Sequence, residues 1–206
     1  MLLTIALMMH HITSRKNNSH LNRLLVRHKP KRMITIISGT NRSGSLTLRI
    51  AQQYQQLLTV RGAAAQILDL AQLPHDFAFS ALYDNGNKNP AFNAFHQQAA
   101  DSDKLVFIIP EYNGSFPGVL KTFLDGMPYP NPWKNRKAAL VGLSSGPQGA
   151  ATALSHFTDV LHYLGIHVLA HRVKMPFIEK NMANDRIQNE SYLFQLNSQV
   201  NSLLAF

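Results

Sequence analysis

The residues best suited to chemistry lie in a polar stretch, 38–47, that joins a short apolar β-branched run to a helical pattern. The stretch is rich in hydroxyl side chains and contains one guanidinium, that of Arg42. Backbone N–H groups at a helix start, hydroxyls and a guanidinium can together bind a phosphate. Gly39 and Gly44 have the GxxxxG spacing of an ATP-binding loop, but Ser45 stands where that motif requires lysine. The stretch therefore suits a phosphate monoester bound without metal, and a serine-rich turn that only caps the helix is the alternative.

A second candidate loop, 110–118, follows the most apolar strand pattern of the chain. It combines two prolines and two glycines with a tyrosine and an asparagine. Such a loop can hold backbone amides in a fixed array that binds the polar edge of a planar heterocycle, while aromatic atoms cover its face. Glu111 is a candidate general base, although no partner acid or nucleophile accompanies it. A rigid turn that caps the next helix is the alternative interpretation.

Strand and helix patterns alternate around these loops. Strands are predicted at Met33–Ser38, Ala64–Leu70, Lys104–Ile109, Ala138–Leu143 and Ile166–Ala170. Helices are predicted at Ser45–Arg61, Ala91–Ala100, Gly118–Leu124, Thr152–Leu164 and Glu190–Leu204. This alternation predicts an α/β three-layer sandwich, with a five-stranded parallel sheet and helices on both faces. Ligands of such sheets bind outside the carboxyl ends of the strands, so the loops after the first, third and fourth strands are the expected site.

Several other chemistries are disfavoured by the residues present. The chain has no cysteine, which excludes disulfides, thiolate nucleophiles and iron–sulfur clusters. Ser144 and Ser145 lack the Gly-x-Ser-x-Gly context of an acyl-transfer nucleophile. His156 and His162 are six residues apart on one helix, and His167 and His171 lie on a predicted strand, so no metal site is predicted.

Two segments carry a resemblance to a known family. Gly-Thr-Asn-Arg-Ser-Gly-Ser-Leu-Thr at 39–47 and Pro-Glu-Tyr-Asn-Gly-Ser-Phe-Pro-Gly-Val-Leu-Lys at 110–121 resemble signatures of the NAD(P)H-dependent FMN reductase family. That family belongs to the flavodoxin-like superfamily and includes quinone, chromate and azo-dye reductases. The resemblance extends over about residues 33–175, and it implies a flavodoxin-like fold, FMN as bound cofactor and NADPH or NADH as electron donor.

The resemblance also implies which residues contact the cofactor. The FMN phosphate would be held by Thr40, Arg42, Ser45, Leu46 and Thr47. The isoalloxazine ring would be lined by Pro110, Glu111, Tyr112, Asn113 and Gly114, and closed on its other side by Ser144, Ser145 and Gly146. Thr47 stands where many relatives carry asparagine, and it keeps a side chain that can form a hydrogen bond.

We therefore expect an FMN-dependent oxidoreductase that passes electrons from NADPH or NADH to a small acceptor, such as a flavin or a quinone, by a ping-pong mechanism. No catalytic side chain is assigned, because the cofactor carries the chemistry. The alternative is a flavodoxin-type electron carrier without nicotinamide turnover. The resemblance implies a homodimer or homotetramer, and we expect a cytoplasmic location. Trp133, set among prolines and basic residues, is expected at a lid or a subunit contact.

The formal charge of +9 is concentrated at the N-terminus. Residues 1–32 hold seven of the 20 basic residues and no Asp or Glu, so 33–206 carry 13 basic and 11 acidic residues. We predict a disordered basic extension over 1–32 and a single domain over 33–206. The apolar run in 1–32 is too short to cross a bilayer, and no aromatics are interleaved with its basic residues. A transit peptide and a nucleic-acid arm are the alternatives, and neither a membrane nor a nucleic acid is expected as a partner.

Overall fold

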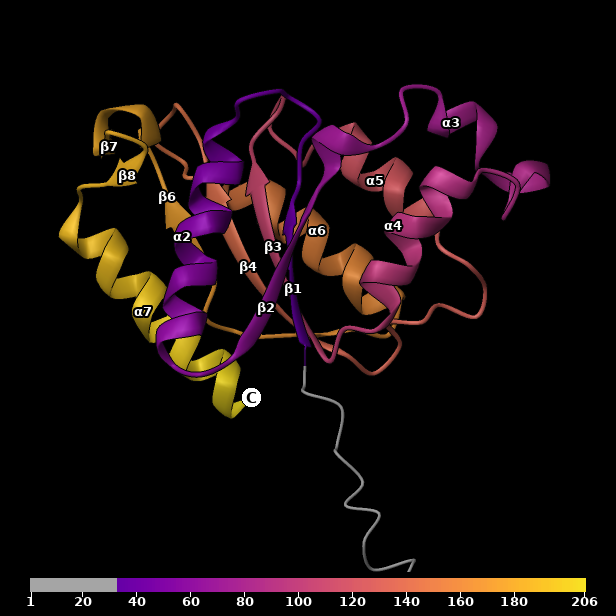
Figure 1. The fold of residues 1–206 in the computed structure, drawn as a ribbon. Helices are drawn as coiled ribbons and strands as arrows, with labels where there is room; N and C mark the ends of the chain where they lie inside the picture. The colour runs from indigo at the N-terminus through magenta and orange to yellow at the C-terminus, as the bar shows by residue number, and fades with distance from the viewer. Residues whose placement is uncertain (1–32) are drawn as a thin grey trace, which may run out of the picture. The chain divides into compact units, whose positions relative to one another are not determined.

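The computed structural model describes residues 33–206, so the prediction for 1–32 lies outside the described residues. The sheet contains β1 (Met33–Ser38), β2 (Ala64–Asp69), β3 (Lys104–Pro110), β4 (Lys137–Leu143), β5 (His167–Val168) and β6 (Val173–Met175). Its strands are ordered β2-β1-β3-β4-β5, with β6 also paired to β4, and all these pairs are parallel (Figure 1). The predicted α/β fold with a parallel sheet is confirmed.

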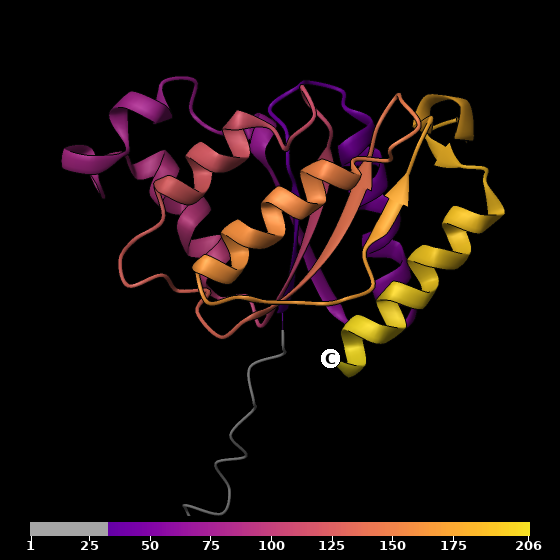
Figure 2. The ribbon, with the colours of Figure 1, turned by 180° about the vertical axis from the view of Figure 1, so that it is seen from behind.

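Helices cover both faces of the sheet because its strands are apolar on both sides. One face packs against α2 (Leu46–Val60) and α7 (Glu190–Ala205) through Ile36, Val106 and Val141. The other face packs through Ile37, Phe107 and Leu140 against the helices α4 (Pro90–Ala100), α5 (Gly118–Asp125) and α6 (Ala151–Tyr163). Figure 2 shows these three helices on the opposite side of the strands from α7. The three-layer arrangement is therefore as predicted.

The edge strand differs from its prediction. Lys137 of β4 is in register with His167 of β5, but Val141 is in register with Val173 of β6. Between these two pairs, the edge segment 167–173 contains two more residues than the matching segment 137–141 of β4. The chain therefore leaves the sheet between Val168 and Val173. The prediction of one strand over 166–170 was incomplete, because the charged Lys174 interrupts the apolar pattern of β6.

Trp133 also differs from its prediction. Its side chain is fully buried, with the indole N–H donating to the carbonyl of Ala99 at 2.8 Å. Its ring packs edge-on against Phe107, with 5.9 Å between ring centroids. The expectation of a lid or a subunit contact was wrong, because the indole fills the core beneath α4 and its one donor finds a partner there.

The remaining elements are short. The connection from β2 to α4 contains two 3₁₀ turns and α3 (Phe77–Ser80). Between β6 and α7 lie a 3₁₀ turn (Ile178–Asn181) and a hairpin formed by β7 (Met182–Ala183) and β8 (Arg186–Ile187). Within residues 33–206, no helix combines the length and the apolar character that crossing a membrane requires.

Candidate active site

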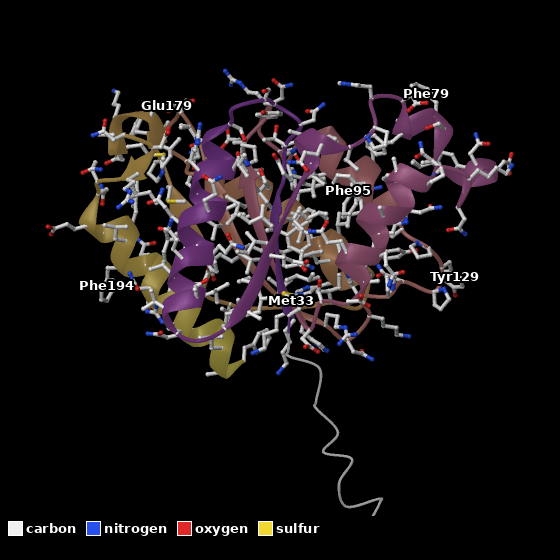
Figure 3. The ribbon with its side chains drawn as sticks, viewed as in Figure 1. Met33, Phe79, Phe95, Tyr129, Glu179 and Phe194 are labelled. Carbon is white, nitrogen blue, oxygen red and sulfur yellow. The ribbon has the colours of Figure 1, made fainter. Side chains whose placement is uncertain are left out.

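The three predicted loops meet at the carboxyl ends of β1, β3 and β4. They form a pocket of about 380 Å³ that extends from the first turn of α2 to the 3₁₀ turn after β6. Figure 3 shows Glu179, at the rim of this pocket, at the opposite end of the sheet from Met33, where β1 begins. The pocket therefore lies where ligands of doubly wound sheets bind.

The first loop is held against β3 by its backbone. The amide of Gly39 donates to the carbonyl of Ile108 at 2.9 Å, and a Cβ atom on Gly39 would lie 2.9 Å from that same oxygen. The loop can approach β3 this closely only because residue 39 is glycine. Three residues later, the amide of Arg42 donates to Thr40 Oγ1 at 3.2 Å, which turns the chain toward α2.

The start of α2 lines one end of the pocket and has the features of an anion site. Ser45 is the N-cap, and its hydroxyl accepts a hydrogen bond from the amide of Leu48 at 3.3 Å. Leu46 and Thr47, whose amides have no partner within the helix, line the pocket beside the exposed side chain of Arg42. Within 33–206, no carboxylate forms an ion pair with Arg42. The free cation and the helix N-terminus together favour an anion, above all a phosphate.

The second loop is a tight two-residue turn. Tyr112 and Ser115 exchange two backbone hydrogen bonds, of 2.8 and 3.0 Å. Asn113 and Gly114 both have positive φ, 51° and 76°, as a type I′ turn requires. The amide of Glu111 donates to the carbonyl of Leu143 at 3.0 Å, which fixes this loop to the end of β4.

The third loop is held by the segment that follows β6. The amide of Ser144 donates to the carbonyl of Met175 at 3.2 Å, and the amide of Ile178 donates back to the carbonyl of Ser144 at 3.0 Å. The Ser145 hydroxyl donates to a carboxylate oxygen of Glu179. The wall of the pocket at this point therefore contains residues from two separate parts of the chain.

Most of the predicted contact residues line this pocket, namely Arg42, Ser45, Leu46, Thr47, Pro110, Glu111, Tyr112, Ser144 and Ser145. The other four do not. Thr40 is fully buried behind the wall, Asn113 and Gly114 form the exposed tip of the turn, and the carbonyl of Gly146 accepts from the amide of Phe177. That all thirteen contact a cofactor stays a prediction.

Five further lining residues were missed, namely Ser43, Gly44, Leu143, Ile178 and Glu179. Ser43 and Gly44 lie inside the first motif, so the motif itself was the signal for them. Ile178 and Glu179 lie beyond the 33–175 stretch of the resemblance, in a polar segment that carries no motif.

The chemistry of the lining residues fits FMN. One end suits an anion, and elsewhere in the pocket Glu111 Oε2 is buried with no hydrogen-bond partner among the described residues. Such an orphaned acceptor requires a donor, and both the ring N–H and the sugar-alcohol hydroxyls of a flavin can supply one. Within 33–206, no group of three or more acidic or histidine side chains could hold a metal ion.

Comparisons with known proteins agree with this geometry. The sequence model of the NADPH-dependent FMN reductase family matches residues 33–179. This chain belongs to that family. It is 35% identical, over 65% of its length and 72% of the relative's, to a 2-hydroxy-1,4-benzoquinone reductase of Burkholderia. It is 34% identical, over 65% and 71%, to an NAD(P)H-dependent FMN reductase of Pseudomonas aeruginosa.

A solved structure gives the same assignment. FerB, a flavoenzyme NAD(P)H:(acceptor) oxidoreductase from Paracoccus denitrificans, superposes with a TM-score of 0.70 and 25% identity, covering 84% of this chain and 96% of FerB. The flavodoxin-like fold and the predicted family membership are thereby confirmed. This FMN reductase is an oxidoreductase that uses FMN and is driven by NAD(P)H.

Proposed function

We propose that the pocket at the carboxyl ends of the strands holds FMN and that quinones are the acceptors the enzyme reduces. One observation carries this proposal: a single cavity joins an anion-binding helix start to a loop with an orphaned buried carboxylate oxygen. FMN has the matching ends, a phosphate and a planar ring with polar edges. When bound, it accepts a hydride from a nicotinamide and passes two electrons to an acceptor.

The residues of the pocket divide into two sets. At the phosphate end, Arg42 and the first amides of α2 bind charge. At the ring end, Pro110 and Tyr112 would cover a planar face, and Glu111 Oε2, which has no partner among the described residues, would accept a hydrogen bond from the flavin. Ser144 and Ser145 close the other side of the pocket. The protein thus binds and orients, and no side chain is assigned a proton-transfer step.

The choice of a small acceptor rests on the relatives and on the shape of the pocket. A 2-hydroxy-1,4-benzoquinone reductase is among the relatives matched over most of their length. Donor and acceptor would both react with the flavin held in this cavity of about 380 Å³. The two substrates would therefore bind in turn, which gives ping-pong kinetics.

An anaerobic titration tests this function. NADPH or NADH should bleach the flavin absorption of the FMN-loaded protein, and a benzoquinone added afterwards should restore it. Steady-state rates at several quinone concentrations should give parallel double-reciprocal lines. A flavin that both nicotinamides leave oxidised would favour an electron carrier, the second function that this fold supports.

We also propose that the enzyme is a homodimer or homotetramer and works in the cytoplasm. Phe79 and Tyr129, which are 85% and 99% exposed, lie on the side of α4 (Figure 3). Exposed aromatic side chains of this kind are enriched at protein interfaces. Sedimentation should show a larger assembly that Phe79→Ser and Tyr129→Ser together weaken. A monomeric wild-type protein would contradict the assembly, and cell fractionation tests the location.

A further inference from the structure

A second hollow, of about 400 Å³, lies between α6 and the edge of the sheet. It is lined by Ala151, Leu154 and Ser155 of α6 and by Ala170, Arg172 and Lys174 of the edge. We call it the edge groove. It lies beside the point where the edge strand leaves the sheet between β5 and β6. The extra residues of the edge and the small side chains of α6 together leave the space open.

The edge groove is basic. Val173 and Met175 are fully buried against the α7 side of the sheet, so Arg172 and Lys174, which alternate with them, lie on the α6 side. Strand residues that face a covering helix are normally apolar. Arg172 makes only a long hydrogen bond, 3.4 Å, to Thr158 Oγ1. Among residues 33–206, no carboxylate forms an ion pair with either cation. Two exposed positive charges therefore line the hollow without an ion-pair partner among the described residues.

The edge groove is close to the flavin pocket through the edge strand. Lys174 directly precedes Met175, whose partner in the sheet is Leu143 of the pocket wall. The carbonyl of Met175 also accepts from the amide of Ser144, another wall residue.

Helix α6 connects the two sites from the other direction. Ser155 lines the groove, and its neighbour His156 forms a hydrogen bond of 3.0 Å with Ser115 in the turn beside the pocket. The first two turns of α6 therefore contact both the ring-binding turn and the groove. A ligand that leaves the pocket over the start of α6 can reach both cations.

We propose that the edge groove binds the 2′-phosphate end of NADPH and makes this enzyme prefer NADPH to NADH. The proposal rests on the proposed function, in which a nicotinamide reduces FMN in the first pocket. Of the two substrates of the proposed reaction, the nicotinamide dinucleotide and the quinone, the dinucleotide carries phosphate groups at a distance from its reacting ring. The planar fork of Arg172 matches a phosphate, and Lys174 adds a point charge. NADH lacks the 2′-phosphate and gains nothing from this pair.

Kinetics of the FMN-loaded enzyme provide the first test. Arg172→Gln and Lys174→Gln should each lower kcat/KM for NADPH about 10-fold to 100-fold, as expected for one hydrogen bond to a charged group. The value for NADH should stay within about twofold. Lys88→Gln removes the same charge from an exposed lysine before α4 and should change neither value. An equal loss for NADPH and NADH in the groove variants, or no loss, would overturn the proposal.

Calorimetry provides a second test that does not depend on turnover. Adenosine 2′,5′-bisphosphate should bind the FMN-loaded protein more tightly than AMP, and Arg172→Gln should remove that difference. Loading with FMN keeps Arg42 from acting as an alternative phosphate site. Equal binding of the two nucleotides by the wild type would overturn the groove assignment even if both nicotinamides reduce the flavin. A flavin that neither nicotinamide reduces would instead count against the proposed function, and the calorimetry would still decide whether the groove recognises a 2′-phosphate.

Discussion

The hydroxyl oxygens of Thr40 and Tyr112 lie 2.7 Å apart, although 72 residues separate them in the chain. Thr40, in the first loop, is fully buried, and Tyr112, in the second loop, is 37% exposed at the pocket. Their loops follow β1 and β3, which are parallel neighbours in the sheet, so both loops leave the sheet at the same edge, where the two side chains meet. This hydrogen bond fixes the ring-binding loop to the phosphate-binding loop, so the two ends of the pocket are positioned together.

Tyr112→Phe should weaken FMN binding while keeping the aromatic face. Loss of one neutral hydrogen bond costs about 0.5–1.5 kcal/mol, so Kd should rise by up to about twelvefold. Thr40→Val removes the same bond from the other side, so the double variant should be little worse than either single one. Fluorescence titration with FMN measures all three. Tyr129→Phe, on a fully exposed tyrosine, is the control, and additive losses in the double variant would contradict the coupling.

Arg42→Ala should weaken FMN binding by about 1.5–3 kcal/mol, the range for a hydrogen bond to a charged group. Riboflavin has no phosphate, so its affinity should hardly change. Titration of both ligands into both proteins gives the comparison, and Arg186→Ala, on the exposed hairpin, removes an equal charge as a control. An equal loss for FMN and riboflavin would show that Arg42 does not bind phosphate.

The first two loops could be predicted from sequence because their chemistry is local. Gly39 is needed within one residue of the end of β1, Ser45 caps the helix that it precedes, and the Asn113-Gly114 pair specifies its own turn. In each case the residue type that the close approach, the helix cap or the turn needs stands within that same short segment of sequence. The βαβ alternation was readable for the same reason, since each crossover follows from neighbouring elements.

The remainder of the site depends on contacts between distant segments. Glu179 reaches the pocket only because the segment after β6 bonds to Ser144 and Ser145, which are more than thirty residues earlier. Arg172 and Lys174 line the edge groove because the edge strand is interrupted between β5 and β6. No local sequence pattern predicts that interruption. The prediction for Trp133 was wrong because it relied on the neighbouring prolines and basic residues. The hydrogen-bond partner that allows burial, the carbonyl of Ala99 in α4, is distant in the sequence.

Gly142→Ala should destabilise the fold by about 1–3 kcal/mol, the usual cost of overpacking. A Cβ atom there would lie 2.8 Å from the carbonyl oxygen of Gly149 and 2.9 Å from the Cβ of Ala150. The third loop must shift to relieve this clash, so FMN affinity should fall as well. Urea denaturation and FMN titration measure the two effects. Gly118→Ala is the matched control, because nothing lies within 4 Å of its added Cβ, and equal stability of the two variants would contradict the steric argument.

His96 should make the fold less stable in mild acid. Its ring lies 4.2 Å from that of Phe92 and 6.1 Å from that of Phe123, and its Nε2 has no hydrogen-bond partner among the described residues. Burial among these rings lowers the pKa of His96 below its ordinary value of 6.5. As the pH falls through about 6.5, His96 therefore becomes protonated in the unfolded chain while it stays neutral in the folded state. The free energy of unfolding decreases over this range, until the pH passes the lower pKa of the folded state. Above about pH 6.5 the imidazole is neutral in both states, and this contribution to the pH dependence vanishes.

Urea denaturation at about pH 7.5 and about pH 5.5 measures this contribution of His96. His96→Leu replaces the imidazole with an apolar side chain that needs no partner, so the stability difference between the two pH values should shrink. His75→Gln removes an exposed histidine from the loop after β2 and should leave the wild-type difference in place. If His96→Leu keeps the full wild-type difference while His75→Gln reduces it, His96 is not the group that destabilises the fold in acid.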